Sequence, residues 1–324
     1  MGMKLEDIGE RALVRRLSGI FSKGSGIIEG AGEDDCAVVD IGHSECLVIT
    51  TDMLHRTTDF PEMMTPWQIG WMSAAVNLSD IAAKGARPLG LVMAMGLTPD
   101  LEVGFVEDIA KGMETCARTY GTYILGGDTD SHSELTIAGT AVGLTQKDLL
   151  VRRSGAKPGD LVCVTGHLGS AGAALRALMN GHEAGGAVMR ALLEPVPRIA
   201  EGLALAATRA VTSMMDVSDG LAVSLYELSR AGGVGFRVHA AKIPMLPEVA
   251  CLDDALSLAT HTGGDFELLF TIRPDALGDV RKACSFSVIG EVTGEGILIE
   301  REGKDETLPE RGYEHLRTTT YPSA

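Results

Sequence analysis

The acidic, glycine-rich stretch Gly30-Ala-Gly-Glu-Asp-Asp35, with the Thr50-Thr51-Asp52 that ends the next apolar run, decides how this chain is expected to fold. Glycines let the backbone approach a ligand closely, and adjacent carboxylates supply hard oxygen ligands. The pattern of a carboxylate after small or hydroxyl residues at the edge of an apolar segment recurs along the chain. These repeats predict that several carboxylates converge on one site. They are Asn77-Leu-Ser-Asp80, Gly126-Gly-Asp128, Asp216-Val-Ser-Asp219 and Gly263-Gly-Asp265.

Carboxylates that converge would raise one another's pKa and push their loops apart unless a metal ion neutralised them. Calcium commonly uses a spaced D-x-D-x-D-G loop, which the sequence lacks. Magnesium takes one or two carboxylates, keeps several waters and shares its coordination shell with substrate phosphates. The pattern therefore predicts a magnesium site that receives a polyphosphate.

The composition restricts the class of protein and its partners. A chain of 324 residues has the length of two domains, and 45% hydrophobic with 22% charged residues is typical of a folded soluble protein. A formal net charge of −16 disfavours nucleic acid and anionic membranes, because the only dense basic group is Arg152 and Arg153 with Lys157. We expect neither kind of partner.

Cysteine usage and hydropathy indicate the cellular compartment in which the protein is expected. The six cysteines form no C-x-x-C pair, and most lie in apolar runs, as buried free thiols do. The N-terminal segment has no apolar signal region, and the longest apolar stretch, residues 89–97, is far shorter than a membrane span. We expect a reduced, cytoplasmic protein.

The periodicity of apolar residues predicts an α/β chain in two halves. Residues 149–160 form the expected linker, so the domains would span residues 1–148 and 149–324. The helix expected at residues 66–85 carries Asn77, Ser79 and Asp80 among apolar neighbours, which indicates a polar face turned toward a site. In the first half we expect helices at residues 5–21, 66–85 and 100–120 and strands at 37–41, 46–50, 89–97, 122–125 and 134–144. In the second half we expect helices at residues 168–180, 197–209 and 275–284, and another helix that begins near residue 219. The strands expected there are at residues 161–165, 213–216, 234–239 and 266–272, followed by two closing strands.

Several familiar motifs are absent or weak. No Gly-Lys pair is followed by Ser or Thr, so a P-loop is excluded. The run Gly166-His-Leu-Gly-Ser-Ala-Gly172 departs from the dinucleotide fingerprint, and we interpret it as a tight turn between a strand and a helix. Arg153 fits either a phosphate contact or a solvated linker position. No catalytic triad can be built from the spacing, and this suits phosphoryl transfer, in which positioning and charge neutralisation dominate.

Taken together and in order, the segments GEDDCAVV, ITTDML, AVNLSDIAAKGARP, GGDT, RRSGAKPGD, VTGHLGSAGAAL, MDVSDGL and GGDFELLFTI resemble the thiamine-monophosphate kinases of the aminoimidazole-ribotide-synthetase-like superfamily. The resemblance covers nearly the whole chain. It implies a two-domain fold with a mixed sheet and packed helices in each domain, and direct transfer of phosphate from ATP to thiamine monophosphate with several Mg²⁺ ions. It also implies a homodimer that pairs the sheets of the N-terminal domains, with ATP in a groove near that interface.

The resemblance further implies a set of site residues. Gly127, Asp128, Arg153 and Ser218 would contact ATP. The metal ligands would be Asp35, Thr50, Thr51, Asp52, Asp80, Asp128, Asp216 and Asp219.

The chain departs from the family pattern on the acceptor side. Asp59 stands where the family usually has His, the segment around Gly264 is one residue shorter than the usual GGEDYEL, and Glu310 replaces a Trp. We hypothesise that Asp59 faces the cationic thiazolium of the acceptor. Another ATP-using enzyme of the superfamily, such as an aminoimidazole-ribotide-synthetase-like ligase, and a non-catalytic nucleotide-sensing relative remain alternatives.

Overall fold

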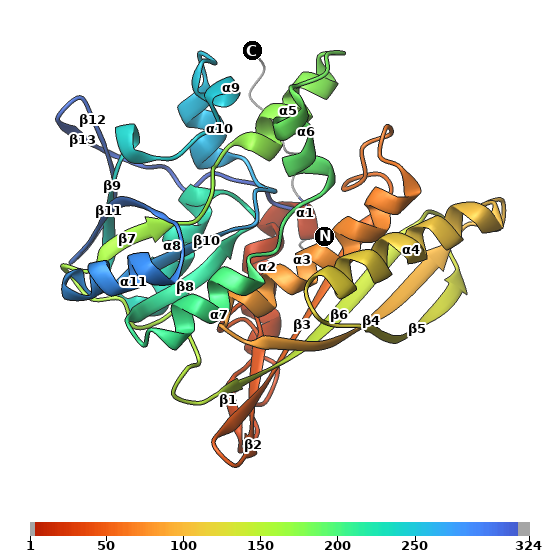
Figure 1. The fold of residues 1–324 in the computed structure, drawn as a ribbon, viewed down its shortest axis with the longest axis horizontal. Helices are drawn as coiled ribbons and strands as arrows, with labels where there is room; N and C mark the ends of the chain where they lie inside the picture. Colours follow the sequence, from red (N-terminus) through yellow and green to blue (C-terminus); the bar gives the residue numbers. More distant parts are fainter. Residues whose placement is uncertain (1–3, 317–324) are drawn as a thin grey trace.

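The computed structural model describes residues 4–316, which form two β-sheets with helices packed against them (Figure 1). The first sheet has six strands in the order β1-β2-β3-β6-β4-β5, and the second has seven in the order β13-β12-β9-β11-β7-β10-β8. Both sheets are mixed, because β4 runs parallel to β5 in the first and β9 runs parallel to β12 in the second. The α/β architecture expected from the sequence is confirmed.

The first sheet is built from residues 27–146, and its central strand β6 lies between β3 and β4. Helices α3 (Pro66–Ala83) and α4 (Val103–Thr119) lie over one face of this sheet (Figure 1). The other face exposes large apolar side chains, among them Met53, Val92 and Leu125. The strands are β1 (Ile27–Glu29), β2 (Ala37–Gly42), β3 (Glu45–His55), β4 (Arg87–Leu97), β5 (Ile124–Ser131) and β6 (Thr136–Gln146).

Helix α3 is the central helix of the molecule. Thr65 caps its N-terminus by accepting a hydrogen bond from the backbone N–H of Gln68 at 3.3 Å, and Pro66 occupies the first helical position, where it loses no helical hydrogen bond. Its residues are mostly apolar and buried on all sides, as expected for a helix enclosed by other elements. It contacts β3 and β6 of the first sheet and also β8 (Val211–Val217) of the second. Polar groups on α3 can therefore meet groups from both halves.

The second sheet has its most buried strand at β10 (Glu267–Ile272), where every residue is buried. The other strands are β7 (Leu161–Val164), β9 (Gly235–His239), β11 (Ser287–Thr293), β12 (Ile297–Arg301) and β13 (Lys304–Thr307). The helices are α5 (Ser170–Met179), α6 (Gly186–Leu193), α7 (Ile199–Ala207), α8 (Leu221–Gly232), α9 (Pro247–Ala250), α10 (Ala255–His261) and α11 (Leu277–Ala283), with 3₁₀ turns η1 (Ala240–Lys242) and η2 (Pro274–Ala276).

Some of the element predictions were wrong in detail. The helix expected at residues 5–21 is two helices, α1 (Leu5–Ile8) and α2 (Glu10–Ser18), because Gly9 breaks it with a φ of 73°. The strand expected to end at residue 125 continues to Ser131, since parallel pairing with β4 carries it past Gly127 and Asp128. Three strands close the second sheet rather than two, and the short helices α6, α9 and α10 were not predicted because they are too brief to show a clear period.

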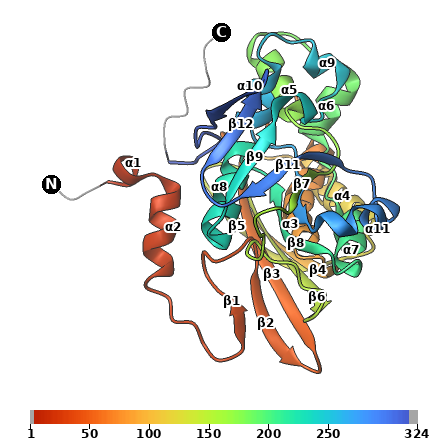
Figure 2. The ribbon, with the colours of Figure 1, turned by 90° about the vertical axis from the view of Figure 1, so that its left-hand side faces the viewer.

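Helix α2 lies at one side of the molecule (Figure 2) and contacts the second half. Arg11 donates a hydrogen bond to the carbonyl of Tyr313 at 2.6 Å and forms an ion pair with Asp219 at 3.3 Å. Helix α2 is thus tied to the last described residues of the chain. The domain limits at residues 1–148 and 149–324 stay a prediction, although the strands of the two sheets fall on either side of residue 149.

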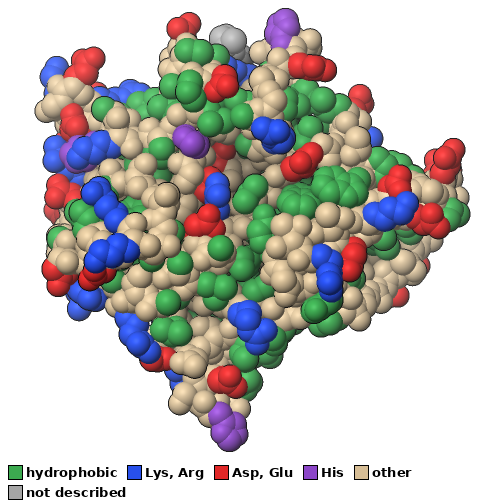
Figure 3. Space-filling model, in the orientation of Figure 1, with side chains coloured by type: hydrophobic (Ala, Val, Ile, Leu, Met, Phe, Trp, Pro, Cys, Tyr) green, Lys and Arg blue, Asp and Glu red, His purple; other side chains and the backbone are tan. Residues whose placement is uncertain are grey.

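The surface bears on the expected partners. On the face drawn in Figure 3, Lys and Arg side chains are interspersed with Asp and Glu and form no continuous basic surface. Within residues 4–316, no helix has both the length and the apolar character needed to cross a membrane.

Candidate active site

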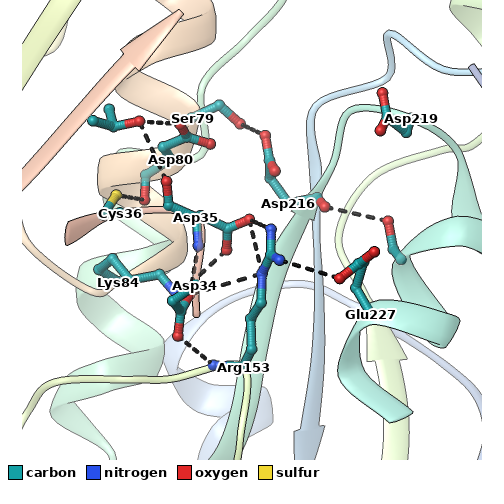
Figure 4. A network of polar contacts seen from close by, with 12 residues as sticks. Asp34, Asp35, Cys36, Ser79, Asp80, Lys84, Arg153, Asp216, Asp219 and Glu227 are labelled. Carbon is teal, nitrogen blue, oxygen red and sulfur yellow. Dashed lines mark hydrogen bonds and ion pairs between the residues drawn. The ribbon is translucent and has the colours of Figure 1, made fainter. Parts of the chain in front are cut away.

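Three carboxylates from different parts of the chain meet at one point (Figure 4). Asp35 lies in the loop before β2, Asp80 on α3 and Asp216 on β8, and one oxygen of each lies within 4.8 Å of the others. We call these three residues the acidic cluster. It lies where α3 bridges the two sheets, so neither half of the chain could form it alone.

Hydroxyl groups orient two of these carboxylates. Thr50 on β3 donates to Asp80 Oδ2 at 2.5 Å, and Ser79 on α3 donates to Asp216 Oδ2 at 2.6 Å. On the same helix, Asn77 accepts a hydrogen bond from the backbone N–H of Asp52 at 3.2 Å. Ser79 and Asp80 of this helix therefore lie at the acidic cluster, and the prediction that the cluster is the functional site stays a prediction.

A buried lysine and a partly buried arginine lie on the opposite side of Asp35. Lys84, at the C-cap of α3, forms an ion pair with Asp34 and lies 3.3 Å from Asp35 Oδ2. Arg153 donates to Asp35 Oδ1 through Nε at 3.1 Å and through Nη2, and its Nη1 lies 3.5 Å from Glu227. Arg153 is therefore an ordered part of the site, and its interpretation as a solvated linker residue was wrong.

The sequence prediction missed Lys84 and Asp34. Asp34 accepts a hydrogen bond from the backbone N–H of Arg153 at 2.9 Å and another from that of Asp35 at 2.8 Å. The signal for Lys84 was present, because a lysine in the apolar run Ile81-Ala-Ala-Lys-Gly-Ala86 has few polar neighbours in sequence and must find a partner when it is buried.

Burial and mutual repulsion shift the pKa values of the acidic residues. Burial, followed by repulsion from Asp35, raises the pKa of Asp216 to about 7. Burial and the neighbouring Asp52 and Asp216 carboxylates raise the pKa of Asp80 well above its ordinary value. Although burial alone would raise it, Arg153 and Lys84 hold the pKa of Asp35 below its usual range. The protein thus supplies charge compensation for Asp35 and leaves Asp80 and Asp216 without a compensating cation of comparable effect.

The acidic cluster fits a hard divalent cation. Its donors are all carboxylate oxygens, which Mg²⁺ prefers. Among the described residues, buried Asp35 Oδ2 has no hydrogen-bond partner, although Lys84 Nζ lies 3.3 Å from it, so this oxygen keeps lone pairs that a ligand could use. Burial and repulsion from Asp35 also raise the pKa of the adjacent Asp52 to about 6, as expected for a group that a positive ion would stabilise.

The remaining predicted metal ligands lie outside the acidic cluster. Thr51 occupies the opposite face of β3 from Thr50, since side chains alternate along a strand, and its hydroxyl donates to the Gly139 carbonyl at 2.8 Å. Asp219 is paired with Arg11 and stands apart from the linked residues in Figure 4. Asp128 is exposed on the edge strand β5. Their roles as ligands stay predictions.

The predicted ATP contacts lie on both sheets. A Cβ on Gly127 would sit 1.9 Å from the carbonyl oxygen of Met93, so the close pairing of β5 with β4 already demands glycine there. Ser218 lies in the loop between β8 and α8, where its carbonyl accepts a hydrogen bond from the Gly264 N–H at 2.7 Å. The structure gives both positions a packing role and leaves their contact with ATP a prediction.

The acceptor-side residues also have partners in the protein. Asp59 Oδ2 accepts hydrogen bonds from the His55 backbone at 2.8 Å and the Thr58 hydroxyl at 2.7 Å, and its charge contributes to the raised pKa of Asp52. Glu310 forms an ion pair with Arg230 at 2.9 Å. Of these two carboxylates, Asp59 is the one whose charge acts on the predicted metal-binding residues.

Asp265 does not join the acidic cluster. Its two oxygens accept hydrogen bonds from the backbone N–H groups of Gly169 at 2.6 Å and Ala171 at 3.0 Å, at the start of α5. Gly169 has a φ of 80°, and a Cβ on Gly172 would lie 2.0 Å from the Thr262 hydroxyl oxygen. These contacts confirm that Gly166 to Gly172 form a tight turn from strand to helix.

Models of known protein families match both halves of the chain. The model of the AIR synthase related protein N-terminal domain matches residues 33–145, and that of the corresponding C-terminal domain matches residues 157–301. The thiamine-monophosphate kinase of Methanospirillum hungatei is 45% identical over 87% of this chain and 92% of its own length. That of Pyrococcus horikoshii is 39% identical over 89% of this chain and 92% of its own length.

A solved structure of a relative has the same fold. AaThiL complexed with AMPPCP and TMP superposes with a TM-score of 0.85 at 28% identity, over 97% of this chain and 99% of the other. The match thus extends through both sheets. This chain belongs to the AIR synthase related family and, within it, to the thiamine-monophosphate kinases.

Proposed function

We propose that this chain phosphorylates thiamine monophosphate with ATP, giving thiamine diphosphate and ADP. A phosphate oxygen of the acceptor forms the new P–O bond, and the bond between the γ-phosphorus and the ADP oxygen breaks. The acidic cluster of Asp35, Asp80 and Asp216 carries the proposal, because it offers the oxygen ligands of a magnesium–nucleotide site in a chain of this kinase family. When bound there, Mg²⁺ supplies neutralisation of the charge on the transferring phosphoryl group.

The residues of the site would hold the cation and orient the phosphate groups. Asp35, Asp80 and Asp216 would hold the cation, with Thr50 and Ser79 fixing two of the carboxylates. Arg153 is held by Asp35 and Glu227 and presents its guanidinium at the edge of the acidic cluster, where it would contact a phosphate. We assign no general base, because the second ionisation of a phosphate monoester, with a pKa of about 6, leaves the acceptor oxygen largely charged near neutral pH.

The nucleotide is proposed to lie along the exposed strand β5. A Cβ on Gly126 would have nothing within 4 Å, so the backbone there is open to a ligand. Asp128 follows on the same exposed strand and could add a ligand to a further magnesium ion carried by the phosphates. Gly127 and Ser218 complete the proposed ATP contacts.

The reaction is tested by incubating the purified protein with ATP, Mg²⁺ and thiamine monophosphate and separating the products. Formation of ADP and thiamine diphosphate in equal amounts supports the proposal. ADP formed without thiamine diphosphate would show ATP hydrolysis and remove thiamine monophosphate as the acceptor. Omission of the acceptor and chelation of Mg²⁺ are the controls.

Asp59→Asn is expected to raise the KM for thiamine monophosphate several-fold while leaving the KM for ATP unchanged. The amide oxygen of asparagine can still accept the hydrogen bonds from His55 and Thr58, so the loop keeps its shape while the negative charge facing the thiazolium is lost. Steady-state kinetics with each substrate varied in turn provide the measurement. An unchanged acceptor KM in both Asp59→Asn and Asp59→Ala would show that this carboxylate does not face the acceptor.

We also propose a homodimer that pairs the first sheets of two copies. Met53 on β3, Val92 on β4 and Leu125 on β5 are 56%, 43% and 62% exposed on the face away from α3 and α4. Leu125 also covers Gly90, whose added Cβ would lie 2.2 Å from it. An apolar sheet face of this kind is typical of an interface between subunits.

Val92→Asp is expected to weaken the dimer by about 100-fold or more, because it places a charge at the centre of an apolar interface. Analytical ultracentrifugation over a range of concentrations measures the dissociation. Val103→Asp is the matched control, since Val103 is 75% exposed but lies on α4, off this face. A wild-type protein that stays monomeric throughout would exclude the dimer.

We propose a cytoplasmic location. All six cysteines lie in the described residues, and all are free thiols in the structure. This is typical of proteins from reducing compartments.

A further inference from the structure

Asp34 and Asp35 are consecutive, nearly inaccessible carboxylates whose oxygens have different partners. The side chain of Asp34 is 2% exposed, and both of its oxygens accept hydrogen bonds, from Lys84, from Asp35 N–H and from Arg153 N–H. Asp35 Oδ1 accepts hydrogen bonds from Arg153. Asp35 Oδ2 has no hydrogen-bond partner, and it lies 3.3 Å from the ammonium nitrogen of Lys84.

Both the side chain and the backbone of Lys84 are held by contacts within the protein. Its side chain is fully buried, and its backbone N–H caps α3 by donating to the Ile81 carbonyl at 3.3 Å. Its carbonyl accepts a hydrogen bond from Val151 N–H at 3.3 Å, which attaches the linker to α3. A lysine ammonium so deeply buried is tolerated only beside negative charge, and here Asp34 and Asp35 supply it.

The ammonium group and a cation in the acidic cluster would share one ligand. Asp35 belongs both to the ion pair with Lys84 and to the cluster with Asp80 and Asp216. Within residues 4–316, loss of Lys84 would leave Asp35 with Arg153 alone as compensation, and Asp34 would lose its only ion pair at hydrogen-bonding distance. Removing one partner of a buried pair leaves an uncompensated charge and is strongly destabilising.

We propose that Lys84 is a built-in counter-ion of the acidic cluster, which keeps Asp34 and Asp35 in place while no divalent cation is bound and shares Asp35 with the cation that binds. This inference rests on the magnesium site of the proposed function. It makes Lys84 a positioning residue that acts through Asp35, and it requires that Lys84 and the divalent cation stabilise the same part of the fold. Their contributions to stability should therefore be less than additive.

The test is thermal unfolding of the wild type and Lys84→Met with Mg²⁺ or Mn²⁺ alone, without nucleotide. Methionine fills a similar volume without charge. Lys84→Met should have a lower Tm in metal-free buffer, and the divalent cation should raise its Tm more than that of the wild type. The concentration that gives half of the rise should fall by about tenfold, since the cation relieves the uncompensated carboxylates.

Lys147→Met is the matched control, because Lys147 pairs with Asp40 on the surface and its replacement should leave the metal response at the wild-type level.

Asp34→Asn should change the metal requirement in the direction opposite to Lys84→Met. It leaves the charge of Lys84 to Asp35 alone, so the metal concentration required should rise. If Lys84→Met folds only when Mg²⁺ or Mn²⁺ is added, the inference is supported.

The outcomes separate the inference from the proposed function. A wild-type protein whose Tm does not respond to either ion would contradict the magnesium site itself. A wild-type response that Lys84→Met reproduces or loses would overturn the role of Lys84 and leave the site in place. If Lys84→Met fails to fold under any condition, Asp34→Asn decides, and an unchanged metal requirement in that variant overturns the inference.

Discussion

Asp216→Asn is expected to lose at least about 100-fold of kinase activity and yet, without metal, to unfold at a higher temperature than the wild type. Activity falls because the acidic cluster loses one of the three carboxylates proposed to hold Mg²⁺. Even residues that merely support metal ligands are commonly worth 10- to 100-fold, so a ligand should be worth about that or more. Asparagine keeps an oxygen that can accept the hydrogen bond from Ser79, so the side chain can stay in place.

The gain in stability follows from the pKa of Asp216. Burial and repulsion from Asp35 raise it to about 7 in the folded protein, above the ordinary value of 3.8 that applies to the unfolded chain. The neutral carboxyl therefore contributes stability that is fully present below the unfolded value and is lost as the pH rises through about 7. Near pH 8 the metal-free wild type carries this cost, on the order of a few kcal/mol, and the asparagine variant does not.

Calorimetry from about pH 6 to about pH 8 in metal-free buffer measures the effect, with the wild type losing stability over this range and Asp216→Asn losing less. Mg²⁺ should reduce the slope of the wild type, because a bound cation stabilises the ionised form. Asp148→Asn is the control, since Asp148 pairs with Arg209 at an exposed position and should change neither property. A metal-free Asp216→Asn that is less stable than the wild type at every pH would contradict the repulsion within the acidic cluster.

Gly112→Ala should destabilise the protein by about 3 kcal/mol or more, as an extra methyl group does when it meets rigid backbone. Where α3 and α4 cross, an added Cβ on Gly112 would lie 1.9 Å from the carbonyl oxygen of Trp67, and one on Gly70 would lie 1.9 Å from that of Ile109. The two helices touch through one glycine from each. Alanine would force them apart, and α3 would carry Ser79 and Asp80 away from Asp216.

Denaturant unfolding provides the measurement, and Gly104→Ala is the matched control on the same helix. An added Cβ on Gly104 would meet nothing within 4 Å, so alanine there should be neutral or stabilise by up to about 1 kcal/mol through its helix propensity. Equal stabilities of Gly112→Ala and Gly104→Ala would show that the two helices do not meet at backbone contact. A lower apparent affinity for Mg²⁺ in Gly112→Ala would link this crossing to the site.

Much of the fold could be predicted from local patterns. The helix at residues 66–85 was predicted from Pro66 and the glycine after its end, and α3 occupies residues 66–83. The hairpin at residues 37–50 appears as β2 and β3. The break at Gly9 and the continuation of β5 past Asp128 were missed, because the first depends on one backbone angle and the second on pairing with β4.

The sequence by itself determined the chemistry that we propose for the site. Carboxylates after small residues at the ends of apolar runs indicated a magnesium–polyphosphate site, and the order of the segments indicated the kinase family, since both depend on residue types and spacing. Tertiary structure decided which residues share the site. Because side chains alternate along β3, Thr50 faces Asp80 and Thr51 faces away from it. Helix α3 brings Asp80 close to Asp216 of the other half. Lys84 is buried beside Asp35 and becomes its partner. These choices depend on which faces the two sheets bury against α3, and that contact joins residues too far apart in sequence for any local pattern to relate them.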